Sequence, residues 1–324
     1  MTNQKYSFIF ICQKGDLEIK SLFLALSLKK YLKVNYELIA VIPEMYNRVE
    51  LPSESTLNIL KKNNIRIEII KNTFCNNSNN YITGDKISNK IFCFNIAVDS
   101  DKIIFLDSDM LCISPFVNNN IFSDYNFIAK QVDVSNVRSW EKIYKIFNIE
   151  MPTQLIPCTV DNFLLPPYFN AGFIAINKSS AKQLYFAWLD FFYKLSEPHI
   201  IEEQLFNPVN RDQVSLAIAV QKLKLNCYIT DEFYNYPIRI KSFSKNNYPC
   251  FAHYHDSLTI FKNKILLDLV KEFINEYSEI KILIKDNKLW NNVFYCTKLK
   301  RNLTLLKHNF KYKFKRRVIQ IRKS

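Results

Sequence analysis

Residues 102–109, Lys-Ile-Ile-Phe-Leu-Asp-Ser-Asp, constrain the fold more than any other stretch of this sequence. Four consecutive apolar residues, Ile103 to Leu106, lead directly into Asp107-Ser108-Asp109. A short apolar run with polar flanks predicts a strand that is buried on both faces. In an open α/β sheet, ligands bind at the edge where such strands end. Two carboxylates spaced i, i+2 at that edge can bind a divalent cation, which prefers oxygen ligands and pairs with phosphate groups.

The same tripeptide occurs eight residues upstream, as Asp99-Ser100-Asp101. This copy follows a stretch with helical spacing, and no buried strand precedes it. We therefore expect Asp99 and Asp101 to lie in a solvated turn, and Asp107 and Asp109 to be functional. The upstream copy serves as an internal control for the downstream one.

The scarcity of glycine excludes two classes of nucleotide-binding loop. The 324 residues include three glycines, Gly15, Gly84 and Gly172. Neither a P-loop nor a GxGxxG dinucleotide fingerprint can be built from them. Hydrophobic residues make up 48% of the chain, which is enough to bury the core of one large domain with an appendage.

Cysteine spacing and the apolar segments favour a cytoplasmic location. Eight cysteines are present and no two are spaced as CxxC, so no cysteine zinc site is predicted. The first apolar run, Phe8 to Cys12, is too short for the core of a signal peptide. No run of about 18 apolar residues predicts a membrane-spanning helix. We therefore expect a protein of the reducing cytosol.

The net charge of +14 is concentrated near the C-terminus. Residues 298–324 contain eleven Lys or Arg and no Asp or Glu, and without these eleven the chain carries +3. Apolar and aromatic residues alternate with the basic ones, a pattern found in segments that bind anionic bilayers or nucleic acid. A solvated tail with no partner is the third interpretation.

Strands and helices alternate through the first hundred residues. Strand patterns cover 6–12, 37–42, 65–70 and 103–106, and helix patterns cover 17–32, 57–62 and 88–98. Pro43 is expected to end the second strand. The alternation is typical of a parallel sheet with right-handed crossovers, so the predicted fold class is α/β.

After Asp109 the pattern is less regular, and we expect a mixed, mostly parallel sheet. Asn170-Ala171-Gly172 is expected to form a small turn before a strand at 173–176. We place a catalytic domain at 1–262 and a helical C-terminal extension at 263–324, with the basic tail from 298. Other expected segments are strands at 125–132 and 249–254, helices at 140–147, 181–195 and 212–223, and a proline-rich loop at 151–167.

Five features then occur in a recognisable order: Lys90, Asp107-Ser108-Asp109, Tyr168 to Gly172, Asp212-Gln213 and His253-Tyr254. In order, spacing and context they resemble glycosyltransferase family 8, which includes glycogenin and the bacterial lipopolysaccharide galactosyltransferases. The resemblance spans residues 5–256, about four-fifths of the chain. It implies a single Rossmann-like transferase domain of the glycosyltransferase A type, which takes a nucleotide-diphosphate sugar as its donor.

The resemblance also implies a metal site. A divalent cation can neutralise the departing diphosphate as a Lewis acid, and Asp107 and Asp109 supply two ligands. The family's third ligand is a histidine before an aromatic residue, here His253. His255 is the alternative, because we expect it on the same face of the same strand. Imidazole among carboxylates favours Mn²⁺ over Ca²⁺, with Mg²⁺ the second choice.

Lys90 and Asn170-Ala171-Gly172 are expected to bind the donor. The resemblance places Lys90 at the sugar or a phosphate, Asn170 can hydrogen-bond a sugar hydroxyl, and Gly172 permits close backbone approach. A solvated surface lysine and a turn without a ligand are the structural alternatives. Cys12 and Gln13 at the end of the first strand are also expected near the donor, as are Asp107, Ser108 and Asp109.

Asp212 and Gln213 are expected to be the catalytic pair beside the transferred sugar. The alternative for Asp212 is a helix N-cap. The amide of Gln213 cannot act as a general base but can support positive charge at the anomeric carbon, which implies a retaining reaction.

Two segments depart from the family pattern. The first loop reads Cys12-Gln13-Lys14-Gly15-Asp16 and lacks the family's usual acidic residues, so uridine is only the default base. The sequence after His255 lacks the family's Gly…Lys-Pro-Trp segment. Lys262 or Lys264 is the candidate replacement for the lysine that contacts the diphosphate.

The implied partners are a nucleotide-diphosphate sugar and a glycan or lipid-linked acceptor. With such a domain attached, residues 298–324 are expected to bind an anionic membrane surface, which makes the protein peripheral. One alternative is a sugar nucleotidyltransferase, which normally has a glycine-rich loop after its first strand. The other is a protein that binds nucleic acid through the tail, which leaves the five internal features unexplained.

Overall fold

The computed structural model describes residues 4–75, 85–243 and 248–295. The chain divides into two compact units, of which the first ends at His253 and the second begins at Tyr254. The boundary that we predict after residue 262 falls within the second unit, between two of its helices.

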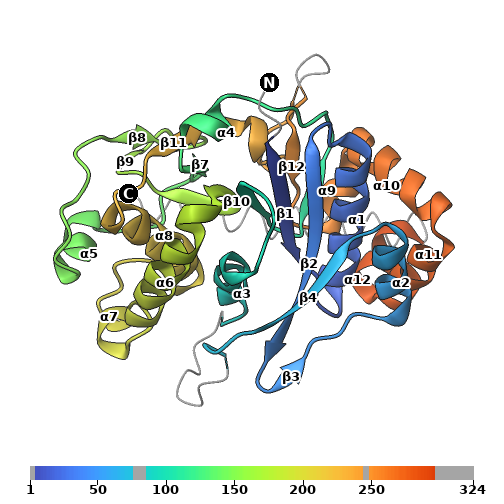
Figure 1. Ribbon diagram of the computed structural model, residues 1–324, viewed down its shortest axis with the longest axis horizontal. Coiled ribbons are helices and arrows are strands. Elements are labelled where there is room, and N and C mark those ends of the chain that lie inside the picture. The colour runs from blue at the N-terminus through green and yellow to red at the C-terminus, as the bar shows by residue number, and fades with distance from the viewer. Residues whose placement is uncertain (1–3, 76–84, 244–247, 296–324) are drawn as a thin grey trace. The chain divides into compact units, whose positions relative to one another are not determined.

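An eight-stranded sheet forms the centre of the first unit, in the order β11-β7-β10-β5-β1-β2-β3, with β4 paired to β2 (Figure 1). β10 is antiparallel to both β5 and β7, whereas β1 pairs in parallel with β2 and β5. This mixed, mostly parallel sheet confirms the predicted α/β class. The strands are β1 (Lys5–Ile11), β2 (Asn35–Met45), β3 (Arg48–Val49), β4 (Arg66–Lys71), β5 (Lys102–Leu106), β7 (Phe127–Gln131), β10 (Phe169–Asn177) and β11 (Cys227–Thr230).

The strand directions bring several strand ends to one edge of the sheet. Because β5 and β7 are both antiparallel to β10, they are parallel to each other, and β11 is parallel to β7. The carboxyl ends of β1, β5, β7 and β11 therefore meet the first residues of β10 along one edge. We call this the carboxyl edge and the opposite one the amino edge.

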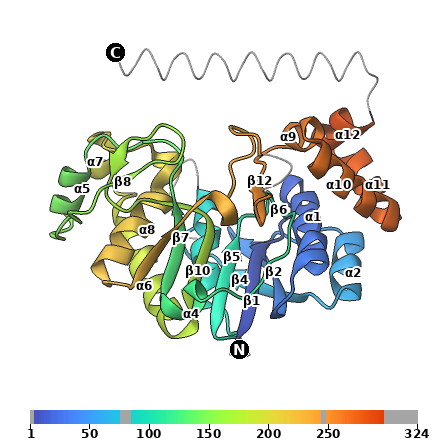
Figure 2. The ribbon, with the colours of Figure 1, turned by 90° about the horizontal axis from the view of Figure 1, so that it is seen from above.

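Helices pack on the sheet through apolar side chains. Ile9 of β1 and Phe105 of β5 join one buried cluster with Phe94, Trp188 and Val214 from the helical segments. The indole N–H of Trp188 donates to the carbonyl of Asp212 at 2.8 Å, which ties α6 to the first turn of α8. Figure 2 shows α6 and α8 on the same side of the sheet. The main helices are α1 (Asp16–Tyr31), α2 (Glu54–Lys62), α3 (Asn89–Phe92), α6 (Lys178–Lys194) and α8 (Arg211–Lys222).

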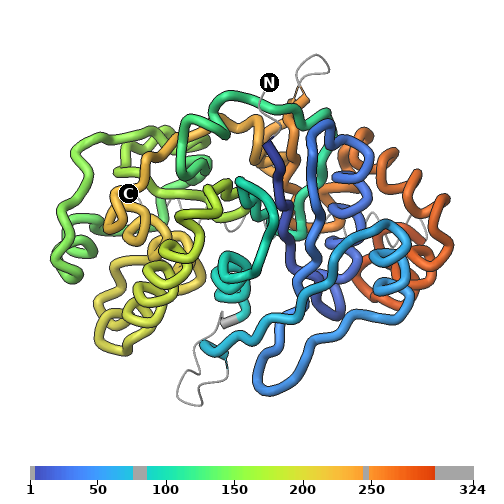
Figure 3. Tube along the Cα trace, viewed as in Figure 1, coloured from blue at the N-terminus to red at the C-terminus, as the bar shows by residue number. Residues whose placement is uncertain are grey.

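Shorter elements complete the first unit. The trace in Figure 3 follows β1 through α1 into β2. β6 (Met110–Cys112) continues from the Asp-Ser-Asp segment and pairs with β12 (Phe251–His253), so chain segments about 140 residues apart lie side by side. The remaining elements are α4 (Ile121–Asp124), α5 (Trp140–Ile146), α7 (Pro198–Glu202), β8 (Ile156–Pro157) and β9 (Leu164–Leu165).

The second strand continues past Pro43, so the predicted stop there is wrong. Pairing between β1 and β2 ends at Val41. Val41 and Pro43 direct their backbone groups to the same side of β2, and at Pro43 no β1 partner is left. The carbonyl of Pro43 accepts from the backbone N–H of Glu50 instead. The missing N–H of proline therefore costs no ladder hydrogen bond.

The segment predicted as a helix at 88–98 is broken. It consists of a 3₁₀ turn at Asp85–Ser88, the single turn of α3, and a second 3₁₀ turn at Cys93–Asn95. The side-chain amide of Asn72 donates to the side chains of Ser88 and Asn89 at 2.8 and 2.6 Å. Such side-chain bonds compete with regular helix formation.

Two further expectations are corrected near the carboxyl edge. Asn170 and Gly172 lie inside β10, where the register with β7 shifts between Asn170 and Ile174, rather than in a turn before the strand. Pairing with β7 extends the strand to Phe169, whereas pairing with β5 begins at Phe173. His255 lies beyond the end of β12 and has a positive φ of 61°, so it does not share a strand with His253.

The described part of the second unit is helical, as predicted from residue 264 onward. It contains α9 (Ser257–Lys262), α10 (Lys264–Glu276), α11 (Ser278–Asp286) and α12 (Lys288–Phe294), and α10 packs against α9 and α11. The basic tail at 298–324 lies outside the described residues. None of the helices in the described ranges combines the length and hydropathy that crossing a membrane requires.

Candidate active site

Asp107-Ser108-Asp109 leaves β5 at the carboxyl edge, as predicted. The backbone N–H of Asp107 donates to the carbonyl of Gly172 at 2.8 Å, on β10. The Ser108 hydroxyl donates to the carbonyl of Ile11 at 2.5 Å, at the end of β1. Bonds to the strands on both sides therefore fix this segment. Asp99 and Asp101 are exposed in a bend before β5, which confirms the turn expected for the upstream copy.

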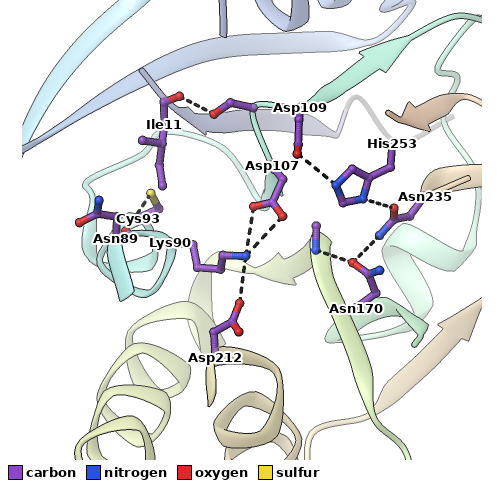
Figure 4. Close-up of polar contacts among 12 residues, drawn as sticks. Ile11, Asn89, Lys90, Cys93, Asp107, Asp109, Asn170, Asp212, Asn235 and His253 are labelled. Carbon is purple, nitrogen blue, oxygen red and sulfur yellow. Dashed lines mark hydrogen bonds and ion pairs between the residues drawn. The ribbon is translucent and has the colours of Figure 1, made fainter. Parts of the chain in front are cut away.

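His253 lies against Asp109. Its Nε2 is 3.0 Å from a carboxylate oxygen of Asp109, and its Nδ1 is 3.1 Å from the side-chain oxygen of Asn235 (Figure 4). Asn235 is fully buried, and no pattern in its surroundings, Phe-Tyr-Asn-Tyr-Pro, marked it as a site residue. Asn235 is 18 residues before His253 in the sequence, and only the folded structure reveals that their side chains meet.

The direction of these hydrogen bonds follows from one backbone group. The N–H of Gly172 can only donate, so the atom of Asn170 that it meets at 3.0 Å is the oxygen. The Asn235 atom 3.1 Å from that oxygen is then the amide nitrogen. The Asn235 oxygen therefore faces His253, whose Nδ1 must carry the proton and donate to it.

If the imidazole is neutral, this assignment leaves a lone pair of Nε2 facing a carboxylate oxygen of Asp109. In a neutral imidazole protonated at Nδ1, Nε2 is an acceptor, and it lies 3.0 Å from an acceptor oxygen of Asp109. Two acceptors at that distance need a proton or a cation between them. A metal-ligating histidine commonly donates its other N–H to an oxygen, as His253 does to Asn235. The residues therefore fit a divalent cation.

Two of the predicted metal ligands lie together in the first unit. Asp109 and His253 each offer one ligand atom, and these two atoms are 3.0 Å apart. The carboxylate of Asp107 faces Lys90. His255, the alternative ligand, belongs to the second unit. The metal-binding roles of Asp107, Asp109, His253 and His255 stay predictions.

Lys90 joins two carboxylates that are far apart in sequence. Its ammonium is 3.1 Å from Asp107 and 3.0 Å from Asp212, and 12% of its side chain is exposed. Burial lowers the pKa of Lys90, but the two carboxylates outweigh it and the net pKa is raised. The pKa of Asp107 is raised by burial, with the charge of Lys90 opposing the shift. Lys90 is therefore not a solvated surface lysine.

Asp212 is the second residue of α8 and does not cap it. The N-cap position is Asn210, and the Asp212 carboxylate contacts Lys90 instead. This excludes the N-cap alternative and turns Asp212 toward the carboxyl edge beside Asp107 (Figure 4). Gln213 follows in the same turn and is partly exposed. The catalytic roles of Asp212 and Gln213 stay predictions.

Asn170 orients its neighbours. Its side-chain oxygen accepts from Gly172 and Asn235, and its amide donates to Asp133 at 3.2 Å. Asp133 also accepts from Thr159 and forms an ion pair with Lys130, whose charge helps to lower the Asp133 pKa against the effect of burial. In this network Asn170 supports His253, and a contact with the donor sugar stays a prediction.

Gly172 leaves room for His253. A Cβ at position 172 would lie 2.9 Å from Cε1 and 3.1 Å from Nδ1 of His253. Ala171 beside it is buried. The imidazole of His253 therefore occupies the space beside Gly172, and a contact between the donor and Gly172 stays a prediction.

Cys12 and Gln13 lie at the end of β1, at the same edge. Cys12 is buried and its thiol accepts from the Ser21 hydroxyl at 3.1 Å. Burial raises the pKa of Cys12 to about 12, so it remains a thiol. Gln13 is also buried, and its side-chain oxygen has no hydrogen-bond partner within the described part of the chain. A donor contact by Gln13 stays a prediction.

A cavity lies at the opposite edge of the sheet, away from these residues. It measures about 630 Å³ and is lined by Gln4, Asp101, Asn177 and Lys178, which belong to the amino edge. Ligands of open α/β sheets bind at the carboxyl ends of strands, so its size does not make it the active site.

Comparisons with known proteins found a family model and similar solved structures. A family model described as the Rhodobacterales glycosyltransferase domain matches residues 8–224, about two-thirds of the chain. Among solved structures, the chain is similar to mouse xyloside xylosyltransferase 1 in its apo form, with 12% identity and a TM-score of 0.42 over 77% of this chain and 97% of that chain. No curated protein matches the sequence. The family model covers most of the sheet, Asp107 to Asp109 and Asp212, so the chain is a glycosyltransferase and belongs to the Rhodobacterales glycosyltransferase domain family.

Proposed function

We propose that this glycosyltransferase moves a sugar from a nucleotide-diphosphate sugar to a glycan or lipid-linked acceptor, with a divalent cation and with retention of configuration. A uridine nucleotide is the default donor and Mn²⁺ the first choice of cation, with Mg²⁺ second. We also propose the placement in glycosyltransferase family 8, which the five-part sequence pattern supports.

One observation carries the proposal. Nε2 of His253 lies 3.0 Å from a carboxylate oxygen of Asp109, next to Asp107, on the sheet edge where ligands bind. A cation held there, with Asp107 as a further ligand, would supply Lewis-acid stabilisation of the departing diphosphate. Membership of a glycosyltransferase family favours sugar transfer over nucleotidyl transfer.

The protein's own side chains would bind and orient the donor. Lys90 is a positive charge between Asp107 and Asp212, and its ammonium would contact a phosphate of a donor bound at this edge. Gln213 offers an amide oxygen beside Asp212 that can support positive charge at the anomeric carbon. Since an amide cannot remove the acceptor proton, the leaving phosphate is the proposed proton acceptor.

A thermal-shift panel tests the donor and the cation. Nucleotide sugars carrying uridine, guanosine or thymidine, each with and without MnCl₂ or MgCl₂, are compared by the midpoint of unfolding. A ligand that binds only the native state raises that midpoint by mass action. We expect a uridine nucleotide sugar to raise it only with a divalent cation. An equal rise without any cation would contradict metal dependence.

Proton NMR of the first product tests retention. The anomeric coupling is read before anomers equilibrate. A product with the donor's configuration supports the proposal. An inverted product would require a carboxylate base, and Asp212 and Asp133 are the first candidates.

We further propose that the enzyme works in the cytoplasm at a membrane surface, to which residues 298–324 attach it. The support is the eleven positive charges of that segment. Deleting 298–324 should release the protein from anionic vesicles and preserve activity on a soluble acceptor. Continued sedimentation of the truncated protein with vesicles would contradict the anchor. Retention of the full chain on RNA but not on vesicles would favour nucleic acid instead.

A further inference from the structure

A second cavity opens at the carboxyl edge, where β7 and β11 end. It measures about 430 Å³, within the usual range of small-ligand sites. Its lining begins directly after the last residue of β11, Thr230. Six of the residues that form it are Thr159, Asp231, Glu232, Phe233, Tyr236 and Lys241. None of them was singled out by the sequence.

The cavity lies on the same sheet edge as Asp107, at a distance set by the strand order. From β5, which leads to Asp107, the order runs through β10 and β7 to β11. Neighbouring strands are about 4.8 Å apart, so three spacings give roughly 14 Å between the ends of β5 and β11. Two sugar units, one donated and one accepting, can fill that span.

Backbone and side-chain bonds join the cavity to the metal-binding residues. The carbonyl of Tyr236 accepts from the backbone N–H of His253 at 2.8 Å, and Asn235 next to it holds the imidazole. On the other side, the Thr159 hydroxyl donates to Asp133 at 2.7 Å, and Asp133 in turn holds Asn170. The same hydrogen bonds therefore hold the walls of the cavity and the side chains of the candidate active site.

The lining combines aromatic rings with hydrogen-bonding groups. Phe233 and Tyr236 are partly exposed, and the backbone of Phe233 is fixed by a bond to Asp231 at 2.9 Å. The Lys241 ammonium pairs with Glu232 at 2.7 Å and donates to the Thr159 carbonyl at 2.5 Å. Aromatic faces suit the apolar face of a sugar ring, and carboxylates accept from its hydroxyls. Two carboxylates against one ammonium disfavour an anionic ligand.

We propose that this cavity is the acceptor subsite and that it binds a neutral sugar residue at the end of a glycan. The inference rests on the proposed function and adds the class of acceptor to it. Phe233 and Tyr236 stack on the ring of the acceptor sugar, and Glu232 accepts a hydrogen bond from one of its hydroxyls.

Two variants test the subsite. Phe233→Ala removes a stacking ring, and Glu232→Gln keeps the shape but removes a carboxylate. Phe186→Ala is the matched control, because Phe186 is a 57% exposed aromatic residue on α6, outside the cavity. Methyl glycosides of glucose, galactose and xylose are compared with methyl glucuronide as acceptors. Saturation-transfer NMR measures their binding, steady-state kinetics gives KM and kcat, and calorimetry gives the dissociation constant of the donor.

We expect at least one neutral glycoside to bind the wild-type protein and the glucuronide not to bind. Phe233→Ala and Glu232→Gln should raise the KM for that acceptor about tenfold, while the donor's dissociation constant and the kinetics of Phe186→Ala stay within twofold of wild type. Acceptor KM values unchanged in both variants would overturn the subsite but leave the proposed function standing. Preference for the glucuronide would overturn the neutral class. A wild-type protein that binds no nucleotide sugar would instead refute the proposed function, and the subsite with it.

Discussion

Asp99-Ser100-Asp101 and Asp107-Ser108-Asp109 flank the same strand, β5, and have the same sequence. At the amino edge, Asp99 and Asp101 are exposed, and Asp101 accepts from the backbone of Lys5 at 3.2 Å. At the carboxyl edge, Asp107 meets Lys90 and Asp109 meets His253. The tripeptide alone therefore does not indicate a site. Its position at the carboxyl or the amino end of β5 decides whether Lys90 and His253 lie beside its carboxylates.

Two lysines show the same difference in their electrostatics. Lys102 begins β5 at the amino edge, and its ammonium donates to the Tyr125 carbonyl at 2.6 Å. Burial lowers the pKa of Lys102 to about 8. Lys90 at the carboxyl edge is also buried, but Asp107 and Asp212 raise its pKa. Desolvation acts on both lysines, and only the carboxyl edge supplies the negative charges that reverse it.

The largest expected effect separates the two tripeptides. Asp109→Asn removes the charge opposite His253 and should lower sugar transfer about a thousandfold, because metal stabilisation of the leaving group contributes several kcal/mol. Asp101→Asn should change turnover less than twofold. Initial rates with a uridine nucleotide sugar and Mn²⁺ measure both, with circular dichroism as the check on folding. Equal losses in the two variants would contradict the assignment.

The next effect concerns the buried charges at the carboxyl edge. Lys90→Met leaves Asp107 and Asp212 without their shared partner and should lower the free energy of unfolding by about 3 kcal/mol, as in other broken buried pairs. The control is Lys194→Met. Lys194 pairs with Asp190 at 2.7 Å, with both side chains about half exposed, so its loss should cost less than about 1 kcal/mol.

Urea unfolding at pH 7 measures the two lysine variants. Donor calorimetry adds a second readout, since the proposed phosphate contact predicts weaker donor binding for Lys90→Met alone. Similar unfolding free energies for Lys90→Met and Lys194→Met would show that the buried triad contributes no more than a surface pair.

The third effect is on Mn²⁺ affinity, and it separates substitutions at two glycines, Gly172 and Gly15. Gly172→Ala forces His253 away from a methyl group that would lie 2.9 Å from Cε1, and should weaken Mn²⁺ binding about tenfold. Gly15→Ala is the control, because its positive φ of 96° brings strain while no atom lies within 4 Å of the added Cβ. Manganese electron paramagnetic resonance titration measures the affinity. Equal Mn²⁺ affinity in Gly172→Ala and the wild type would contradict the role of His253.

The smallest effect is a pH dependence at the amino edge. Because the folded pKa of Lys102 is about 8, below its ordinary value of 10.5, the unfolded state binds more protons between these values. Stability due to Lys102 should therefore rise with pH over that window, by about 1 kcal/mol between pH 7 and 9. Lys102→Met should abolish this rise in urea titrations. A rise of the same size in Lys102→Met would assign it to other groups.

The local sequence predicted those elements in which every residue is buried between neighbouring strands. Ile103 to Leu106 lie between strands on both sides and are fully buried, so four apolar residues sufficed to identify β5. Where tertiary partners intervene, prediction failed. Side-chain bonds from Asn72 accompany the broken helix near Ser88, and pairing with β7 extends β10 through Asn170.

The site was predictable where one motif sufficed and hidden where distant segments meet. Asp107 and Asp109 follow from a strand and two carboxylates. The contact of Lys90 with Asp212 joins residues 122 positions apart, and no local pattern encodes it. Asn235 is a single asparagine between tyrosines, and its importance arises only from the bond to His253. Long-range geometry, more than residue type, was the missing information.

The antiparallel direction of β10 has a consequence for how this enzyme could change its substrate. Since β10 starts at the carboxyl edge, the segment entering it arrives beside the same edge that β5 and β7 leave. Residues 151–167, which contain Thr159, therefore form a border of the site whose length and sequence can vary while the sheet keeps its register. Evolution, or an engineer grafting loops, can alter this border and leave His253 in place as long as the bond of Thr159 to Asp133 is kept.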